Sequence, residues 1–205
     1  NLNTINDIGA NKGQFSLVAR HLFHETKIIG FEPLLKPAEK YRNLFKNDKN
    51  VFFHQTAIGN QSGNVQMHIS KRVDSSSILK IGDNQSKIFP GTEESHVLDI
   101  NIGRLIEYVK INDLVSPVFV KIDVQGYELN VLEGCIELIN NFEYIFVETS
   151  FIELYEKQPL ANHIISFLNK HSFILKGIYN TIYDKDGLAV QADFLFNRIK
   201  NSKNS

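Results

Sequence analysis

Three charged residues stand at the carboxyl ends of two apolar runs, where side chains of these types can carry out proton transfer. Lys121 and Asp123 belong to the run 118–123 (VFVKID), and Glu148 ends the run 144–148 (YIFVE). Near-continuous apolar runs indicate parallel strands covered on both faces, so both carboxylates are expected at one edge of a sheet. A carboxylate with a tuned pKa can act as a general base, which makes Asp123, Glu148 and Lys121 the candidate catalytic residues.

These three residues also have a purely structural interpretation. Lys121 is flanked by apolar residues, and a buried ammonium group needs a charged partner, which Asp123 or Glu148 could supply. The trio would then be an ion pair that ties the two strands together. The sequence favours a functional role for Asp123 and leaves both interpretations open for Lys121 and Glu148.

The beginning of the chain has the composition of a ligand-binding loop. A β-type run over residues 4–8 leads into the glycine-containing segment 9–13 (GANKG). Glycines let the backbone approach a ligand, and a helix N-terminus offers backbone N–H groups. An ordinary connection with glycines at a tight turn is the alternative. The apolar stripe that predicts the following helix consists of Phe15, Val18, Ala19 and Leu22. The residues predicted to bind a cofactor here are Asp7, Gly9, Ala10, Asn11, Gly13 and Gln14.

The spacing of the two glycines restricts the kind of cofactor. Gly9 and Gly13 are separated by three residues, which differs from the Gly-x-Gly-x-x-Gly pattern of dinucleotide-binding loops. No Lys-Ser/Thr pair follows the second glycine, so a phosphate cradle is absent from the sequence as well. A loop that binds a nucleoside without phosphates fits best, and S-adenosylmethionine is the predicted cofactor.

Two further segments supply candidate cofactor contacts. Glu32 and Pro33 follow the apolar run 27–31, about 20 residues after the glycine loop, where an acid is placed to accept hydrogen bonds from both ribose hydroxyls. Pro33 holds the next turn open. Ala57 and Ile58 end the third predicted strand, 51–58, and are assigned either to an adenine-binding surface or to plain strand-end core.

The remaining pattern predicts a single α/β domain over residues 1–205. Helices are expected over 36–46, 161–171 and a segment with the core stripe Leu129, Leu132, Ile136 and Ile139. The run 64–69 alternates as a half-exposed antiparallel strand does, and runs 173–179 and 192–196 predict a closing antiparallel hairpin. Residues 70–95 are irregular and poor in apolar residues, which predicts a lid that includes Ser75, Ser76 and Ser77, or else a mobile surface loop.

Composition excludes several classes of protein. A net charge of −1 argues against a nucleic-acid partner, and no apolar run approaches the length of a membrane span. The only cysteine, Cys135, can form no internal disulfide, which favours a reducing, cytoplasmic setting. No zinc motif is present, so no metal site is predicted, although Asp123 and Glu148 could contribute to a magnesium site.

Four motifs together resemble the FkbM family of S-adenosylmethionine-dependent methyltransferases. They are residues 7–13, 31–33 (FEP), 121–128 (KIDVQGYE) and 146–149 (FVET), and the similarity runs from Thr4 to about Phe196. The resemblance implies a class I methyltransferase fold: a Rossmann-like, mostly parallel seven-stranded sheet with helices on both faces and an antiparallel C-terminal strand. It also implies O-methylation of a small-molecule or glycan acceptor, often a sugar hydroxyl, with the glycine loop, Glu32 and the Asp123 region as cofactor contacts.

The sequence departs from the family pattern at two positions. Gln125 stands where an acid is frequent, and Ile106 occupies a second position where the family often places an acid. Two other functions remain as alternatives, a nicotinamide-dependent oxidoreductase and a non-catalytic nucleoside-binding module. The glycine spacing counts against the oxidoreductase, because a pyrophosphate needs the closer glycine pair.

Overall fold

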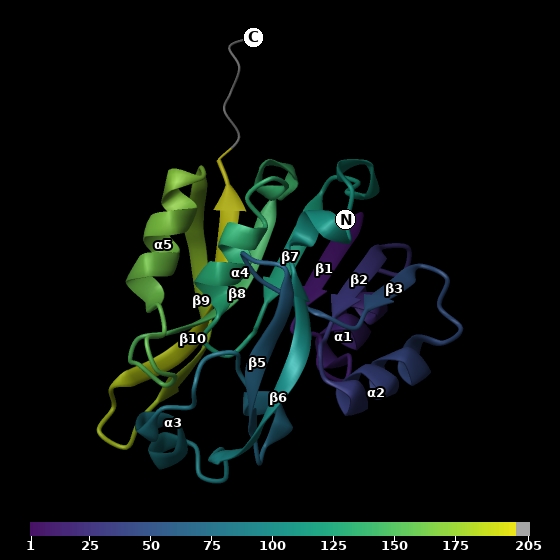
Figure 1. The fold of residues 1–205 in the computed structure, drawn as a ribbon. Coiled ribbons are helices and arrows are strands. Elements are labelled where there is room, and N and C mark those ends of the chain that lie inside the picture. The colour runs from purple at the N-terminus through teal and green to yellow at the C-terminus, as the bar shows by residue number, and fades with distance from the viewer. Residues whose placement is uncertain (200–205) are drawn as a thin grey trace.

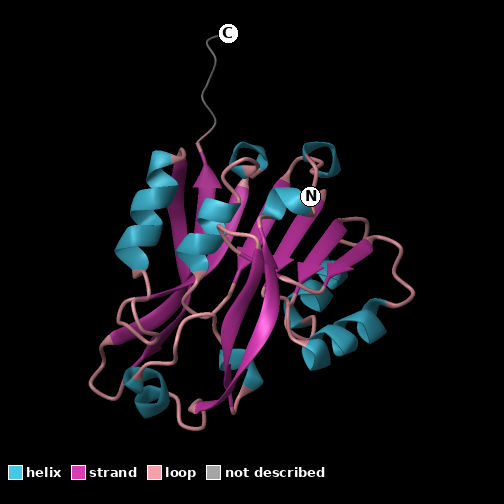
Figure 2. Cartoon of the chain, in the orientation of Figure 1, coloured by secondary structure: helices cyan, strands magenta, loops and turns pink. Residues whose placement is uncertain are grey.

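A seven-stranded sheet forms the centre of the structure (Figures 1 and 2). The computed structural model describes residues 1–199. The first five strands of the sheet order run parallel, and the last two form an antiparallel hairpin. The fold class predicted from the sequence is therefore confirmed. In sheet order the strands are β3 (Val51–His54), β2 (Lys27–Phe31), β1 (Thr4–Ile8), β7 (Val118–Ile122), β8 (Tyr144–Ser150), β10 (Ala189–Arg198) and β9 (Phe173–Tyr183).

The register of the central strands brings charged residues together. In the parallel ladder between β1 and β7, Asp7 is the neighbour of Lys121, and Lys121 is in turn the neighbour of Phe146 on β8. Every residue of β1 is buried, as expected for a strand with partners on both sides. The carboxyl ends of β1, β2, β7 and β8 consequently meet at one edge of the sheet, where parallel α/β proteins bind their ligands.

Helices cover both faces of the sheet. The main core cluster contains Val131 and Leu132 from α4 and Ile164 and Leu168 from α5, packed against one face. On the other face, Ala19 of α1 packs against the β1 and β2 strands. The helices are α1 (Gln14–Leu22), α2 (Leu35–Phe45), α3 (Asp83–Ile88), α4 (Glu128–Gly134) and α5 (Ala161–Lys170), and short 3₁₀ turns occupy Val73–Ser75, Leu105–Glu107, Ile111–Asp113 and Ile139–Asn141.

Two predicted helix stripes are partly wrong. Val18 and Leu22 are 58% and 63% exposed, because α1 instead buries Ser16 and Ala19 against the sheet. Ile136 is 41% exposed because α4 ends at Gly134, so the helical period stops before this residue. A helix period extrapolated past the end of the helix therefore assigns the wrong face.

A small second sheet packs on the face that carries α4. It consists of β4 (Ala57–Ile58), β6 (Glu94–Gly103) and β5 (Gly63–Ser70) in that order, with β5 and β6 antiparallel as the alternation predicted. The single strand predicted over 51–58 is divided, since the chain leaves the large sheet after His54 and joins the small sheet at Ala57. Met67 and Ile100 from this sheet belong to the same core cluster as Ile8 and Phe31, so the small sheet stands beside the carboxyl edge of the large one.

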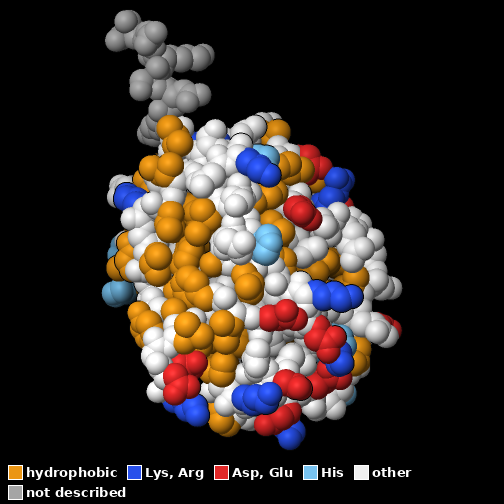
Figure 3. Space-filling model, turned by 90° about the vertical axis from the view of Figure 1, so that its left-hand side faces the viewer, with side chains coloured by type: hydrophobic (Ala, Val, Ile, Leu, Met, Phe, Trp, Pro, Cys, Tyr) orange, Lys and Arg blue, Asp and Glu red, His pale blue; other side chains and the backbone are white. Residues whose placement is uncertain are grey.

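Exposed apolar side chains gather on the side of the molecule that carries α5 and β9 (Figure 3). In β9 they are Ile174, Ile178, Tyr179, Ile182 and Tyr183. The strand lies at the end of the sheet order, and an edge strand is the part of a sheet with which other strands can pair. None of the helices in residues 1–199 is long and apolar enough to cross a membrane.

The end of α4 at Gly134 separates Leu132 from Ile136, two residues predicted to share one core stripe, and this gives a stability test. Leu132 is fully buried, whereas Ile136 is 41% exposed. Leu132→Ala should lower the free energy of unfolding by about 2–5 kcal/mol, because it removes a buried side chain and leaves a cavity. Ile136→Ala, the matched control, should cost about 0.5 kcal/mol. Urea unfolding measures both changes in stability. Equal losses would mean that Ile136 is as well packed in the core as Leu132.

Candidate active site

The glycine loop connects three strands of the large sheet. The backbone N–H groups of Gly9 and Ala10 both donate to the carbonyl oxygen of Phe31, at 3.0 and 2.9 Å. Gly9 has a φ of 79°, and a Cβ there would lie 1.9 Å from the carbonyl oxygen of Asp123. Only glycine therefore lets the loop pass this close to the end of β7. Gly13 ends the loop with a φ of 91° and packs against the rings of α2.

Glu32 is held from both sides by backbone groups. One carboxylate oxygen accepts a hydrogen bond from the N–H of Asn11 at 3.0 Å, and the other accepts from the N–H of Leu34 at 2.9 Å. The side chain is buried, and this burial raises the pKa of Glu32 to about 7 although the two N–H groups favour its ionised form. The carboxylate is therefore fixed in position at the wall of a pocket.

Lys121 lies between two carboxylates. Its Nζ is 3.3 Å from Asp7 Oδ1 and 3.5 Å from Asp123 Oδ2, and it donates to the carbonyl oxygen of Gly9 at 2.8 Å. Burial by itself would lower the pKa of Lys121, but Asp7 and Asp123 outweigh it and raise the pKa above its usual range. The ion partners of Lys121 are thus Asp7 and Asp123, whereas the sequence suggested Asp123 or Glu148.

Asp7 is completely buried under the glycine loop. Its second oxygen accepts a hydrogen bond of 2.6 Å from the Ser16 hydroxyl, which also lies 2.9 Å from the hydroxyl of Tyr41. A buried carboxylate is stable only when it is paired and hydrogen-bonded, and Lys121 and Ser16 provide both. Asp7 therefore contacts the glycine loop through Lys121, and it lines neither of the two pockets described next.

Gln125 joins two carboxylates at the ends of neighbouring strands. Its Nε2 donates to Asp123 Oδ1 and to Glu148 Oε2, both at 2.8 Å, and its Oε1 accepts from the Tyr155 hydroxyl at 2.9 Å. Burial and, secondly, the charge of Asp123 raise the pKa of Glu148 well above its usual value. Gln191 also donates to Glu148, at 2.9 Å. An amide with two donors suits this position, where another acid would face two carboxylates.

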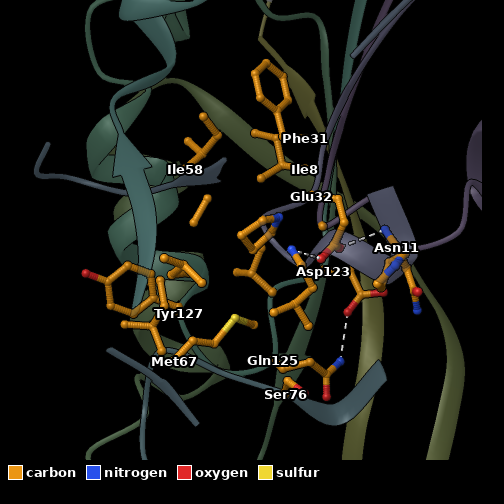
Figure 4. Close-up of a pocket in the computed structure, with 18 of the residues that line it drawn as sticks. Ile8, Asn11, Phe31, Glu32, Ile58, Met67, Ser76, Asp123, Gln125 and Tyr127 are labelled. Carbon is orange, nitrogen blue, oxygen red and sulfur yellow. Dashed lines mark hydrogen bonds between the residues drawn. The ribbon is translucent and has the colours of Figure 1, made fainter. Parts of the chain in front are cut away.

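A pocket with about 740 Å³ of space, part of it open to solvent, lies between the carboxyl edge and the small sheet (Figure 4). One side presents Glu32, Asn11 and Asp123, and the other is apolar, with Met67 and Tyr127. The predicted site residues that line it are Gly9, Asn11, Glu32, Pro33, Ala57, Ile58 and Asp123.

Other predicted residues lie outside this pocket. Ala10, Gln14 and Lys121 line a second pocket, which also includes Gly9, Asn11 and Asp123. Glu148 lines neither pocket and reaches Asp123 through Gln125. Gly13 likewise lies in neither, since it packs against α2.

Sequence reasoning missed several pocket residues. Gln125 and Tyr127 were within a quoted motif, but their neighbours across space could not be inferred from it. Met67 and Ile100 come from the small sheet, and no pattern in the sequence indicated where that sheet packs. Tyr155 lines neither pocket but contacts the Gln125 amide, and it lies in a segment without any recognised motif.

The segment 70–95 is more tightly packed than its composition suggested. Ser75, Ser76 and Ser77 are all buried, and the carbonyl oxygen of Ser75 lies 3.1 Å from the Tyr155 hydroxyl, whose single proton it shares with Gln125 Oε1. The low apolar content of this segment predicted few buried contacts, and the burial of these three serines shows that this prediction is wrong. Ser76 does line the pocket, together with Asp74. Closure of this segment over a ligand stays a prediction.

The described residues contain no group of three or more His, Cys, Asp or Glu side chains arranged to hold a metal ion. Asp123 and Glu148 are instead bridged by the amide of Gln125. Methyl transfer is expected to proceed without an added metal, and an assay with a chelator checks this.

The family model of the methyltransferase FkbM domain matches residues 7–175. The match covers most of the chain and includes every predicted cofactor and catalytic residue. The chain belongs to this family of methyltransferases, and its cofactor is S-adenosylmethionine. The alternative of a nicotinamide-dependent oxidoreductase finds no support in this match.

Two curated proteins are similar to the chain. Methyltransferase 1 of Beauveria bassiana (strain ARSEF 2860) is 27% identical over 140 residues, which cover 62% of this chain and 56% of that protein. The 2-O-methyltransferase NoeI of Sinorhizobium fredii (strain NBRC 101917 / NGR234) is 27% identical over 169 residues, covering 79% of this chain and 69% of NoeI. The chain thus spans little more than half the length of the first of these relatives.

Solved structures share the fold. The precorrin-6y C5,15-methyltransferase of Geobacter metallireducens GS-15 superposes with a TM-score of 0.53 at 11% identity, over 98% of this chain and 81% of that one. Streptococcus pneumoniae Sp1610, a putative tRNA (m1A22) methyltransferase in complex with S-adenosyl-L-methionine, gives 0.51 at 11% identity, over 98% and 69%. At such low identity the similarity concerns the fold alone.

The bridge between Asp123 and Glu148 predicts a pH-dependent effect of Gln125→Glu. The substitution removes a double donor and adds a carboxyl group beside two others, so its pKa in the folded protein should be raised. The loss in free energy of unfolding is then small at about pH 5, where the new carboxyl group can stay protonated. It grows to about 1–3 kcal/mol at about pH 8, where the new carboxyl group must ionise beside the two others.

Urea unfolding at the two pH values measures this cost. Asn47→Asp, the same kind of amide-to-acid change at an exposed position, is the control. An identical loss at both pH values for Gln125→Glu would mean that the new carboxyl group does not face Asp123 and Glu148.

Proposed function

We propose that this domain transfers a methyl group from S-adenosylmethionine to a hydroxyl group of a sugar, with Asp123 as the general base. The observation that carries the proposal is the position of Asp123. Its side chain is 39% exposed, and it belongs to the lining of both pockets at the carboxyl edge. A group shared by two pockets can act between a cofactor in one and an acceptor in the other.

The residues of the first pocket fit the nucleoside part of the cofactor. Glu32 offers a fixed carboxylate for ribose hydroxyls, and Asn11 has a buried Oδ1 without a hydrogen-bond partner among residues 1–199. Ala57, Ile58 and Met67 provide an apolar surface for a flat base. Such a combination of apolar walls with a few fixed polar groups is typical of cofactor sites.

Asp123 is proposed to accept the acceptor's proton. When bound, S-adenosylmethionine supplies a methyl group whose transfer forms a carbon–oxygen bond, breaks the carbon–sulfur bond with its electron pair moving to sulfur, and releases the hydroxyl proton. Asp123 is oriented by two contacts, from Lys121 on one oxygen and from Gln125 on the other. Positioning of this kind accounts for much of the catalysis of such displacements.

Lys121 and Glu148 are proposed to act through Asp123. The raised pKa of Lys121 keeps it cationic, so it can stabilise the Asp123 carboxylate but cannot remove a proton. Glu148 is held by amides of Gln125 and Gln191 and lines neither pocket. Both are therefore positioning residues in this proposal.

Similarity to the 2-O-methyltransferase NoeI supports a hydroxyl acceptor, and the residue types of the second pocket support a sugar. The direct experiment incubates the domain with isotope-labelled S-adenosylmethionine and a panel of methyl glycosides, and detects methylated products by mass spectrometry. We expect at least one glycoside to gain a methyl ether. Turnover of an amine or a ring nitrogen, with none of any glycoside, would contradict the proposal.

Replacement of Glu32 should weaken cofactor binding. Glu32→Ala removes the carboxylate proposed to accept the ribose hydroxyls, so S-adenosylhomocysteine should bind more weakly by about 1.5–3 kcal/mol. Glu39→Ala, which changes an exposed glutamate on α2, is the control. Calorimetry gives both affinities. Unchanged binding by a folded Glu32→Ala protein would remove Glu32 from the cofactor site.

Cofactor binding should also depend on pH. Because burial raises the pKa of Glu32 to about 7, Glu32 changes its protonation state near neutral pH. The ionised carboxylate is the stronger acceptor for hydroxyl groups, so binding should strengthen by about tenfold between about pH 6 and about pH 8 and then level off. Glu32→Gln should abolish this dependence. A flat profile for the unmodified protein would show that Glu32 is already ionised or takes no part.

A further inference from the structure

A second pocket lies on the opposite face of the sheet edge from the cofactor pocket. Its walls come from the glycine loop and α1 on one side and from the strands β8, β9 and β10 on the other. The lining residues used below are Phe15, Lys121, Asp123, Phe146, Asn180 and Asp193. Asp123, Gly9 and Asn11 also line the first pocket, so these three residues separate the two spaces.

Two polar side chains stand at the far wall of the second pocket. Asn180 Nδ2 donates to Asp193 Oδ2 at 2.7 Å. Among residues 1–199, Asn180 Oδ1 and Asp193 Oδ1 take part in no hydrogen bond. The two residues lie where the β9–β10 hairpin is irregular. Asn180 has a φ of 50°, and the strand register shifts between Gln191 and Asp193. An acceptor oxygen on each residue is therefore available to a ligand.

Aromatic rings form the other walls. Phe15 stacks on Phe119 with ring centroids 6.0 Å apart, and Phe146 lies 6.2 Å from Phe119 and 6.3 Å from Tyr179. These contacts hold Phe15 and Phe146 in place beside the pocket. Rigid rings next to amide and carboxylate oxygens suit a ligand that has an apolar ring face and several hydroxyl groups.

The charges of the pocket indicate a neutral ligand. Lys121 is its only cation among residues 1–199, and this ammonium group is already paired with Asp7 and Asp123. Asp193 adds a further acidic group without a cationic partner in the described part of the chain. A phosphate or carboxylate on the ligand would therefore meet repulsion, whereas hydroxyl groups can donate to the acidic and amide oxygens.

We infer that the second pocket binds a neutral pyranose as the methyl acceptor, with Asn180 and Asp193 holding its hydroxyl groups and Asp123 facing the hydroxyl that is methylated. The inference rests on the proposed function and names the acceptor class and its site. Neither Asn180 nor Asp193 was recognised from the sequence. They act as specificity residues, since their contacts select hydroxyl-bearing ligands without touching the cofactor pocket.

Binding of methyl glycosides tests the assignment without relying on turnover. The probes are the methyl glycosides of glucose, galactose, mannose and rhamnose, observed by saturation-transfer NMR with the protein saturated by S-adenosylhomocysteine. Asn180→Ala and Asp193→Asn are compared with Asn64→Ala and Asp99→Asn, the same changes at exposed positions of the small sheet. Circular dichroism and calorimetry with S-adenosylhomocysteine report folding and the cofactor site.

We expect at least one glycoside to bind, and both pocket variants to weaken it by about tenfold or more, as the loss of a polar contact to a ligand hydroxyl does. Their affinity for S-adenosylhomocysteine and the behaviour of both control variants should stay unchanged. Binding of a glycoside to the pocket variants as tightly as to the unmodified protein would overturn the assignment, as would a panel in which no glycoside binds.

A third result would show that the second pocket binds part of the cofactor rather than the acceptor. If Asn180→Ala and Asp193→Asn lose affinity for S-adenosylhomocysteine, the pocket holds the amino-acid end of the cofactor and the assignment is overturned. Failure of the proposed function has a different signature, which is methyl transfer to a nitrogen acceptor and none to any glycoside. Transfer to glycosides that is equally efficient in the pocket variants would leave the function standing and remove this site.

Discussion

The buried ammonium group of Lys121 is the contact on which the site depends. It joins β7 to β1 through Asp7, touches the glycine loop through the carbonyl oxygen of Gly9, and reaches Asp123 at the pocket. Removing one member of such a group leaves an unpaired charge in the interior, which costs more than the pair itself contributes. Lys121, Asp7 and the loop are therefore constrained together, and Asp123 takes its position from them.

A second layer of contacts controls the carboxylates at the sheet edge. Asp123 and Glu148 end neighbouring parallel strands, so their charges are forced close together. The Gln125 amide relieves this repulsion by donating to both, and Tyr155 fixes which way the amide points. The glutamine that departs from the family pattern thus has a physical explanation here, because a third carboxylate would raise the electrostatic cost of the cluster.

The small sheet completes the site from outside the large sheet. Its side chains close the apolar side of the first pocket, while the segment 70–95 is tied to the Gln125 region through the contact between Tyr155 and Ser75. The Tyr155 hydroxyl thus contacts both this segment and the Gln125 amide that bridges Asp123 and Glu148. The β9–β10 hairpin supplies one wall of the second pocket, so the two pockets share Gly9, Asn11 and Asp123 and take their other walls from different parts of the chain.

The sequence by itself determined the fold class and the succession of the main strands along the chain, because glycine spacing and apolar periodicity are local properties, and four motifs together indicated the family. It also identified Glu32 and Asp123 as residues at the sheet edge, since strand ends can be located from the pattern. Only the tertiary structure decided the partner of Lys121, the bridge by Gln125 and the pairing of Asn180 with Asp193. Each of these depends on register and packing between segments far apart in the chain. A pattern read along the chain holds no information about such distances, which is why Val18, Leu22 and Ile136 were assigned to the core and are exposed.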